Sequence, residues 1–308
     1  MQLQTLCDQR KEMNRNHFED KMQLMLNQYR DNCNNLHAGS MKGKCAAEEL
    51  AGEFYFILQN VKQIFDSNLS TDIKNYKGLS EENCAKLTLY YNGLLKNRDE
   101  LQELTIKTAY GIFFQGIHFT PNASAKTERV WLTSLIEKKL ENTVFEIDEK
   151  QRFSDILYSL DTSLSDITAL HYKPFQGHNS DMGCYYRHLY QIVTSISTLP
   201  PDEFSEQDKY AYAKLLRSHL SDYEQFLLYY NALSDFGEVW NKPINSEQSG
   251  APMNMGLIAR YRLVKNLPSN VYWRLLCPID KYKNEINVWK KMGADFFETS
   301  QFLTVNYG

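Results

Sequence analysis

The stretch DMGCYYRHLYQIVTSISTLPPDEFSEQDKYAYAKLLRSHLSDYEQFLLYYNAL (181–233) decides the fold class of this chain. Its apolar residues recur at helical spacing on both sides of Pro200-Pro201, where a helix must end. Ser221 followed by Glu224 has the form of a capping box inside the second apolar series. The stretch therefore predicts an antiparallel helical hairpin whose second arm kinks or restarts at Ser221.

The segments around this hairpin also have helical periodicity. Residues 3–36 contain no Gly or Pro and predict one long, rather polar helix, which the glycines of 37–44 end. Residues 45–65 predict a second helix, and a turn-rich stretch comes after it. Ser80 and the acidic residues after it predict the N-cap of a helix that continues to about 114. Shorter helices are expected at about 126–141, 149–160, 253–266 and 279–299.

Composition favours the same fold class and excludes several others. Only 14 Gly and 8 Pro interrupt 308 residues, which is typical of an all-α protein. The net charge of −4 argues against an electrostatic nucleic-acid binder, and six scattered cysteines argue against a disulfide scaffold or a zinc site. No apolar run approaches the roughly 20 residues of a membrane-spanning helix, and the N-terminus does not resemble a secretory signal.

We therefore expect an all-α multi-helix bundle with a long N-terminal helix and a central antiparallel hairpin. It is predicted to form a single domain over residues 1–308, with N-terminal helices at 1–120, a variable connecting region at 121–175 and a C-terminal core at 176–308. A cytoplasmic location is expected from the missing membrane helix and signal. No sequence motif calls for a cofactor or a metal ion.

Two blocks of the C-terminal half are similar to one known family. GHNSDMGCYYRHLYQIV (177–193) contains Gly-His, an aromatic pair and Arg-His-Leu-Tyr, and KYAYAKLLRSHLSDYEQFLLYYNALSDFG (209–237) contains Leu-Arg-x-x-Leu-Ser-x-x-Glu before Tyr-Asn. In this order they resemble the putative phage abortive infection proteins of bacteria. Residues 18–32, 52–61 and 256–268 are similar more loosely. The resemblance thus covers most of the chain and is weak at 66–170.

The resemblance implies antiviral defence in bacteria, in which an infected cell is halted before phage release. It does not imply a known reaction, so whether the chain is an enzyme is left open. We expect a sensor or interaction protein that binds a phage or host protein as its trigger and causes growth arrest. The protein is expected to form a homodimer through its opening helix. Many relatives begin with a transmembrane hairpin that this sequence lacks, so no membrane partner is expected for this chain.

The candidate site residues come from the two arms of the hairpin. Positions equally far from a turn near 201–202 face each other, which places Arg187 and His188 level with Arg217. The candidate catalytic residues are therefore His178, Arg187, His188, Arg217 and Glu224. Buried arginines would need a carboxylate, carbonyl oxygens or a bound anion, and a histidine beside them could transfer a proton. The alternative is a structural network that sets the register of the helices.

The alternative function is a metal-independent RNase effector of the HEPN type, with RNA as its partner. Such helical RNases use an arginine and then a histidine after four to six intervening residues. The pattern occurs at Arg10–His17 and Arg30–His37, and the second pair is preferred because it lies at the helix end. A seven-residue separation places any two residues on one helix face, so the spacing alone does not decide.

Overall fold

The computed structural model describes residues 2–119, 121, 125–150, 175–243, 255–267 and 275–297 of the chain. Regular structure in these residues is almost entirely helical, and their one sheet pairs β1 with β2 over two residues each. The all-α prediction is confirmed. In chain order the elements are α1 (Gln2–Asn34), β1 (His37–Ala38), β2 (Met41–Lys42), α2 (Lys44–Asp66), α3 (Ser70–Lys74), α4 (Glu81–Lys96), α5 (Arg98–Gln115), α6 (Thr127–Lys150), α8 (Asn179–Ser197), α9 (Glu206–Arg217), α10 (Asp222–Leu233), η2 (Glu238–Trp240), α11 (Leu257–Tyr261), α12 (Pro278–Lys281) and α13 (Lys283–Lys291).

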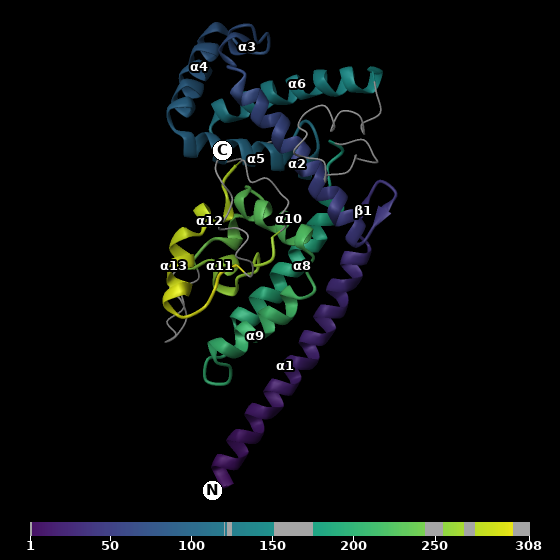
Figure 1. Cartoon of the computed structure of the whole chain (residues 1–308), viewed down its shortest axis with the longest axis vertical. Coiled ribbons are helices and arrows are strands. Elements are labelled where there is room, and N and C mark those ends of the chain that lie inside the picture. Colours follow the sequence, from purple (N-terminus) through teal and green to yellow (C-terminus); the bar gives the residue numbers. More distant parts are fainter. Residues whose placement is uncertain are drawn as a thin grey trace.

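Helix α2 lies at the centre of the described fold, and α5, α6 and α10 pack around it (Figure 1). Residues 49–58 are buried with no face left for solvent, because the segment is apolar almost all round. The Phe54 ring lies 4.8 Å from that of Tyr230 and 5.5 Å from those of Tyr110 and Phe113. One aromatic side chain thereby joins three helices, and burial of this kind is the main stabilising contribution to a fold.

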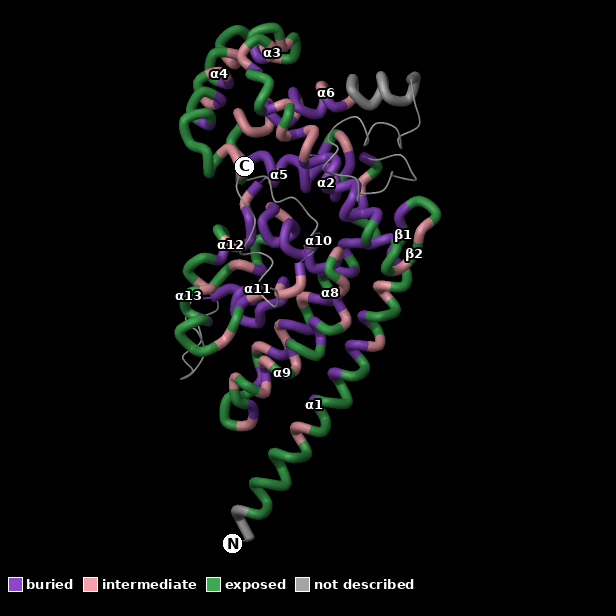
Figure 2. Tube along the Cα trace, in the orientation of Figure 1, coloured by how far each residue is buried: buried purple, intermediate pink, exposed green. Residues whose placement is uncertain are grey.

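Helix α1 extends beyond the rest of the described structure at its N-terminal end (Figures 1 and 2). Residues 5–13 are exposed, and Leu6 and Met13 have 61% and 64% of their surface open. Burial begins at Phe18, whose ring lies 4.9 Å from that of Tyr212 on α9. The long opening helix is therefore present as predicted, but it packs on the body only along its later turns. None of the described helices is both long and apolar enough to cross a membrane.

Helices α9 and α10 each begin at a serine with a closed capping box, whereas α8 begins after His178 without a side-chain cap. Ser205 starts α9 with a capping box closed by Asp208. The Ser221 hydroxyl accepts the N–H of Glu224, and the Glu224 carboxylate accepts the N–H of Ser221. Because this second box is complete, Ser221 starts a new helix rather than kinking an old one. Helix α8 packs against α9, whereas α10 packs against α2 and α5.

The prediction of one helix from Ser80 to about 114 is wrong in one respect, because this segment forms the two helices α4 and α5. Asn97 takes an extended backbone conformation between them, and its side chain accepts the N–H of Glu100 to cap α5. An Asn-x-x-Glu cap can interrupt a helix as effectively as a glycine, because its side chain replaces the missing intrahelical acceptor. The turn-rich stretch before Ser80 contains the short helix α3.

The later helices also differ from their predicted bounds. Helix α6 runs to Lys150, past the predicted end at 141, and the helix expected at 149–160 lies outside the described residues beyond 150. Helix α11 is short because Arg262 adopts a left-handed conformation with φ of 49°. The segment expected to be helical at 279–299 contains α12 and α13.

Candidate functional site

The chain enters α8 by crossing the end of α5 at very close range. Gly177 has φ of 81°, and a Cβ atom at this position would lie 2.5 Å from the carbonyl carbon of Gln115. The next N–H, that of His178, donates to the carbonyl oxygen of Phe114 at 2.9 Å. The crossing therefore fixes where the His178 side chain can reach.

That side chain is buried against Glu53 of α2. His178 Nε2 lies 2.6 Å from Glu53 Oε2, and Glu53 Oε1 accepts the N–H of Phe175 at 2.8 Å. Glu53 is fully enclosed, and the ring of Phe113 lies 5.0 Å from the imidazole. Such a pair holds the segment before α8 on the central helix. The His178 side chain is 10% exposed and that of Glu53 is 0% exposed, so the pair has the character of a structural contact.

Glu224 is the centre of a second buried cluster, which joins α1, α8 and α10. Its Oε1 accepts hydrogen bonds from Tyr29 Oη and Cys33 Sγ, each at 3.1 Å, while Oε2 accepts the N–H of Ser221 at 2.7 Å. Tyr29 Oη also lies 2.9 Å from Tyr185 Oη. Burial raises the pKa of all three donor side chains, Tyr29, Tyr185 and Cys33, so they stay protonated near neutral pH.

Arg217, at the end of α9, is buried in a different place. Its guanidinium donates to the carbonyl oxygens of Arg262 at 3.0 Å and Tyr261 at 3.4 Å. The guanidinium of Arg262 in turn lies 4.1 Å from the ring of Tyr210 and 4.4 Å from that of Trp289. Arg217 thus fastens the α11 segment to α9. Carbonyl oxygens, one of the partners expected for a buried arginine, satisfy it here.

Arg187 and His188 lie closer to the surface of α8. Arg187 is exposed, and its guanidinium donates to Cys184 Sγ of the same helix at 3.2 Å. His188 is partly buried, with Nδ1 2.9 Å from the side-chain amide nitrogen of Asn32 on α1. Burial lowers the pKa of His188, so its imidazole is neutral near pH 7.

The hydrogen bonds of the five candidates do not meet in one polar cluster within the described residues. His178 bonds to α2, His188 and Glu224 bond to α1, and Arg217 bonds to the α11 segment. Arg187 bonds within its own helix. The predicted neighbourhood placed the residues of the second arm by their distance from the turn alone. The new start of α10 breaks that arm and directs it onto α2 and α5 instead.

The secondary pair also lacks a common contact in the described structure. Arg30 is exposed and donates to the side-chain oxygen of Asn27 at 2.5 Å. His37 is exposed in β1, opposite Lys42 of β2. Among the described residues, no group of three or more histidine, cysteine, aspartate or glutamate side chains is arranged to hold a metal ion.

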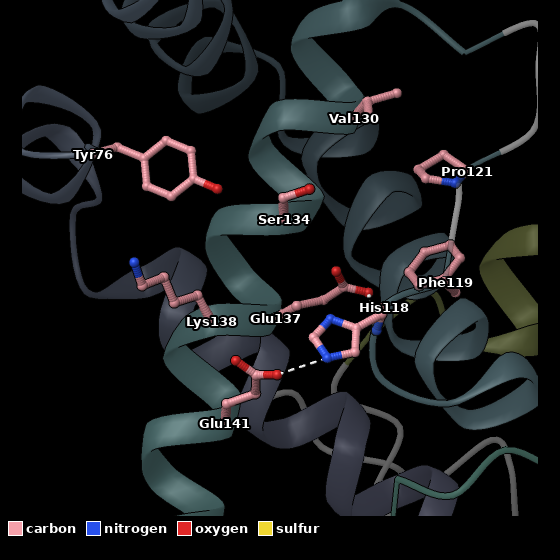
Figure 3. Close-up of a pocket in the computed structure, with 9 residues that line it drawn as sticks. All are labelled: Tyr76, His118, Phe119, Pro121, Val130, Ser134, Glu137, Lys138 and Glu141. Atoms are coloured by element: carbon pink, nitrogen blue, oxygen red, sulfur yellow. Dashed lines mark hydrogen bonds and ion pairs between the residues drawn. The ribbon is translucent and has the colours of Figure 1, made fainter. Parts of the chain in front are cut away.

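A cavity of about 370 Å³, lined by both polar and apolar side chains, lies over one face of α6 and was not predicted from the sequence (Figure 3). Its floor runs along one stripe of α6, since Val130, Ser134, Glu137 and Glu141 are spaced at three to four residues. The remaining lining residues are Tyr76, His118, Phe119, Pro121 and Lys138. The helix was expected near these positions. The loop after α5 crosses over that helix, and this tertiary contact has no counterpart in the local sequence pattern from which it could have been predicted.

Residues 177–271 match the model of one protein family. Its description is "Putative phage abortive infection protein". The match confirms the resemblance seen in the sequence, and the family description points to phage abortive infection. No curated protein and no solved structure matched the chain.

The matched segment, residues 177–271, contains all five candidate residues, whereas Arg30, His37 and the α6 cavity lie outside it. The start of α8 is tied to the preceding part of the chain through Glu53, α10 through Tyr29 and Cys33, and α9 through the ring contact of Tyr212 with Phe18. The segment is therefore packed as one unit with α1 and α2.

Sequence reasoning missed these partner residues of α1 and α2. Glu53 had a usable signal, because it is a lone carboxylate inside the apolar run AGEFYFIL (51–58), where a buried charge must have a partner. Tyr29 and Cys33 had none, since a tyrosine and a cysteine on a helical stripe are ordinary core residues.

Proposed function

We propose that this chain acts in phage abortive infection as a sensor or interaction protein that triggers growth arrest. The supporting observation is the character of the matched segment. His178, Arg217 and Glu224 are buried and bonded to other parts of the protein, which is the pattern of a scaffold. The surface that extends into solvent is instead the N-terminal part of α1.

The exposed part of α1 is suited to contact another chain. Leu6 and Met13 lie seven residues apart and therefore on one face of the helix, and both are more than half exposed. Polar and charged residues separate them, so the face resembles a narrow seam rather than a broad apolar patch. A second copy of this helix is the proposed occupant, and a phage or host protein is the proposed trigger.

We expect the double substitution Leu6→Glu and Met13→Glu to abolish protection against phage without unfolding the protein. The two charges would be placed in the proposed seam, where like charges on a second copy repel. Plaque counts at matched protein levels measure protection, and analytical ultracentrifugation measures the oligomeric state.

The matched control is the double substitution Leu95→Glu and Leu215→Glu, which adds the same two negative charges at two exposed apolar residues outside α1. The control should protect like the wild type. Full protection by the α1 variant, with an unchanged oligomeric state, would contradict the proposed role of this helix.

The second candidate is a metal-independent RNase effector, and His188 is the residue that favours it. Among the five candidates, His188 is the partly exposed histidine, and burial lowers the pKa of its imidazole, so the neutral ring could accept a proton. On this hypothesis His188→Ala loses protection and leaves total RNA intact after infection, whereas the wild type degrades it. Gln191→Ala, which changes an exposed residue of α8 outside the five candidates, is the control for general surface effects. Intact RNA in protected wild-type cells would exclude the RNase function.

A further inference from the structure

The α6 cavity has an uneven distribution of charge. Figure 3 shows Glu137 and Glu141 extending from α6 towards His118, on the side where Phe119 and Pro121 lie. The Lys138 ammonium extends to the other side, 5.8 Å from the centre of the Tyr76 ring. The cavity therefore has a basic and aromatic end and an acidic end.

Glu137 is the buried group of the acidic end. Its side chain is 5% exposed, and Oε1 accepts the backbone N–H of His118 at 3.1 Å. Burial raises the pKa of this carboxyl group to about 7, and the nearby Glu141 adds a smaller increase. Backbone hydrogen bonds from His118 and Phe119 lower the pKa of Glu137, but no described cation does, either from α6 itself or from α2 and α4, which pack against α6.

Glu141 provides a second carboxylate one helical turn away. Its Oε1 lies 2.9 Å from His118 Nε2, and the His118 side chain is 76% exposed. A ligand can reach this pair because the imidazole is held by a single contact at the surface. The side chain of Phe119 is buried beside the two carboxylates and forms part of the cavity lining.

We propose that the acidic end of this cavity binds a guanidinium group. A guanidinium is planar, donates in a bidentate manner to a carboxylate and stacks on aromatic rings, and Glu137, Glu141 and Phe119 provide those two kinds of contact. It would supply the positive charge that the described surroundings of Glu137 lack. The volume of about 370 Å³ falls in the range of small-ligand sites. This inference does not depend on the proposed function.

Binding should release a proton and tighten as the pH rises. Without ligand, the Glu137 carboxyl is about half protonated at pH 7, because its pKa is about 7. A bound cation favours the carboxylate, so affinity increases by roughly tenfold between pH 6 and 8 and then levels off. The His118 imidazole also contacts Glu141, at 2.9 Å, and would compete with a guanidinium for that carboxylate. A His118→Ala variant, which keeps Glu137, separates the two groups.

The test is isothermal titration calorimetry on the full chain with three probes at millimolar concentration. Agmatine carries a free guanidinium, acetyl-Gly-Arg-Gly-amide carries it in a polypeptide, and citrulline amide carries an uncharged group of the same shape. Binding of agmatine alone indicates a small-molecule ligand. Binding of the peptide indicates an arginine of a partner protein. Binding of neither, or equal binding of citrulline amide, overturns the proposal.

Variants link the binding to the carboxyl group. We expect Glu137→Gln to weaken binding at least tenfold and to remove most of its pH dependence, whereas its amide oxygen can still accept the His118 N–H and preserve the loop. Glu128→Gln is the matched control, because it removes a carboxylate from the first turn of α6 outside the cavity. Unchanged affinity and pH dependence in Glu137→Gln would show that the cavity is not a guanidinium site.

Discussion

Gly177→Ala is expected to destabilise the protein by about 3 kcal/mol or more. The left-handed backbone at φ of 81° costs a residue with a Cβ roughly 1–2 kcal/mol. The new methyl group would also lie 2.5 Å from the carbonyl carbon of Gln115 and 2.6 Å from the nitrogen of Gly116, and overpacking against backbone adds about 1–3 kcal/mol. Urea denaturation monitored by circular dichroism measures the loss.

Gly177 also sets the position of the next residue, His178. Any shift that relieves the clash moves His178 away from Glu53, so the variant should also lose phage protection through a lower level of folded protein. Gly93→Ala is the control, because no atom lies within 4 Å of its Cβ position in α4. That change should stabilise by roughly 0.5–1 kcal/mol. Similar stability of the two variants would show that the crossing of α5 is looser than these distances indicate.

Glu224→Ala is expected to destabilise the protein by about 4 kcal/mol. It removes the carboxylate half of the capping box at Ser221, worth about 1 kcal/mol, and leaves the buried Tyr29 Oη and the partly buried Cys33 Sγ without this acceptor. A buried donor that loses its acceptor costs about 1–3 kcal/mol. The raised pKa of Tyr29 means that its hydroxyl keeps its proton and still requires an acceptor.

Asp208→Ala is the matched control for Glu224→Ala. Asp208 closes a capping box of the same local form at the start of α9, but that box is exposed and its tertiary contact is a partly exposed ion pair with Arg15. The expected loss is about 1–2 kcal/mol. The difference between the two variants measures the buried cluster. Equal losses in urea denaturation would mean that Tyr29 and Cys33 contribute nothing beyond the cap.

The helices themselves could be predicted closely from local pattern. The two serine caps at Ser205 and Ser221, and the glycines after α1, act through contacts within a few residues, so both partners are visible in the sequence. Asn97 was missed although its partner Glu100 is equally close, because the apolar pattern continues through it.

The contacts of the candidate residues could not be predicted in the same way. Their placement depended on the direction of α10 after its restart, and a capping box does not specify the angle at which the next helix leaves. The sequence separations show why. Tyr29 and Glu224 are 195 residues apart, and Glu53 and His178 are 125 apart, so each contact depends on packing of the whole chain.

Sequence alone determined the all-α class, the long polar opening helix and the starts of α9 and α10, because helical periodicity and caps are local properties. Tertiary structure alone decided that Glu53 and Glu224 have buried partners, that Arg217 bonds to carbonyl oxygens, and that a loop covers one face of α6 to form a cavity. These features arise where distant helices meet, and desolvation at those meeting points determines which polar groups must be paired.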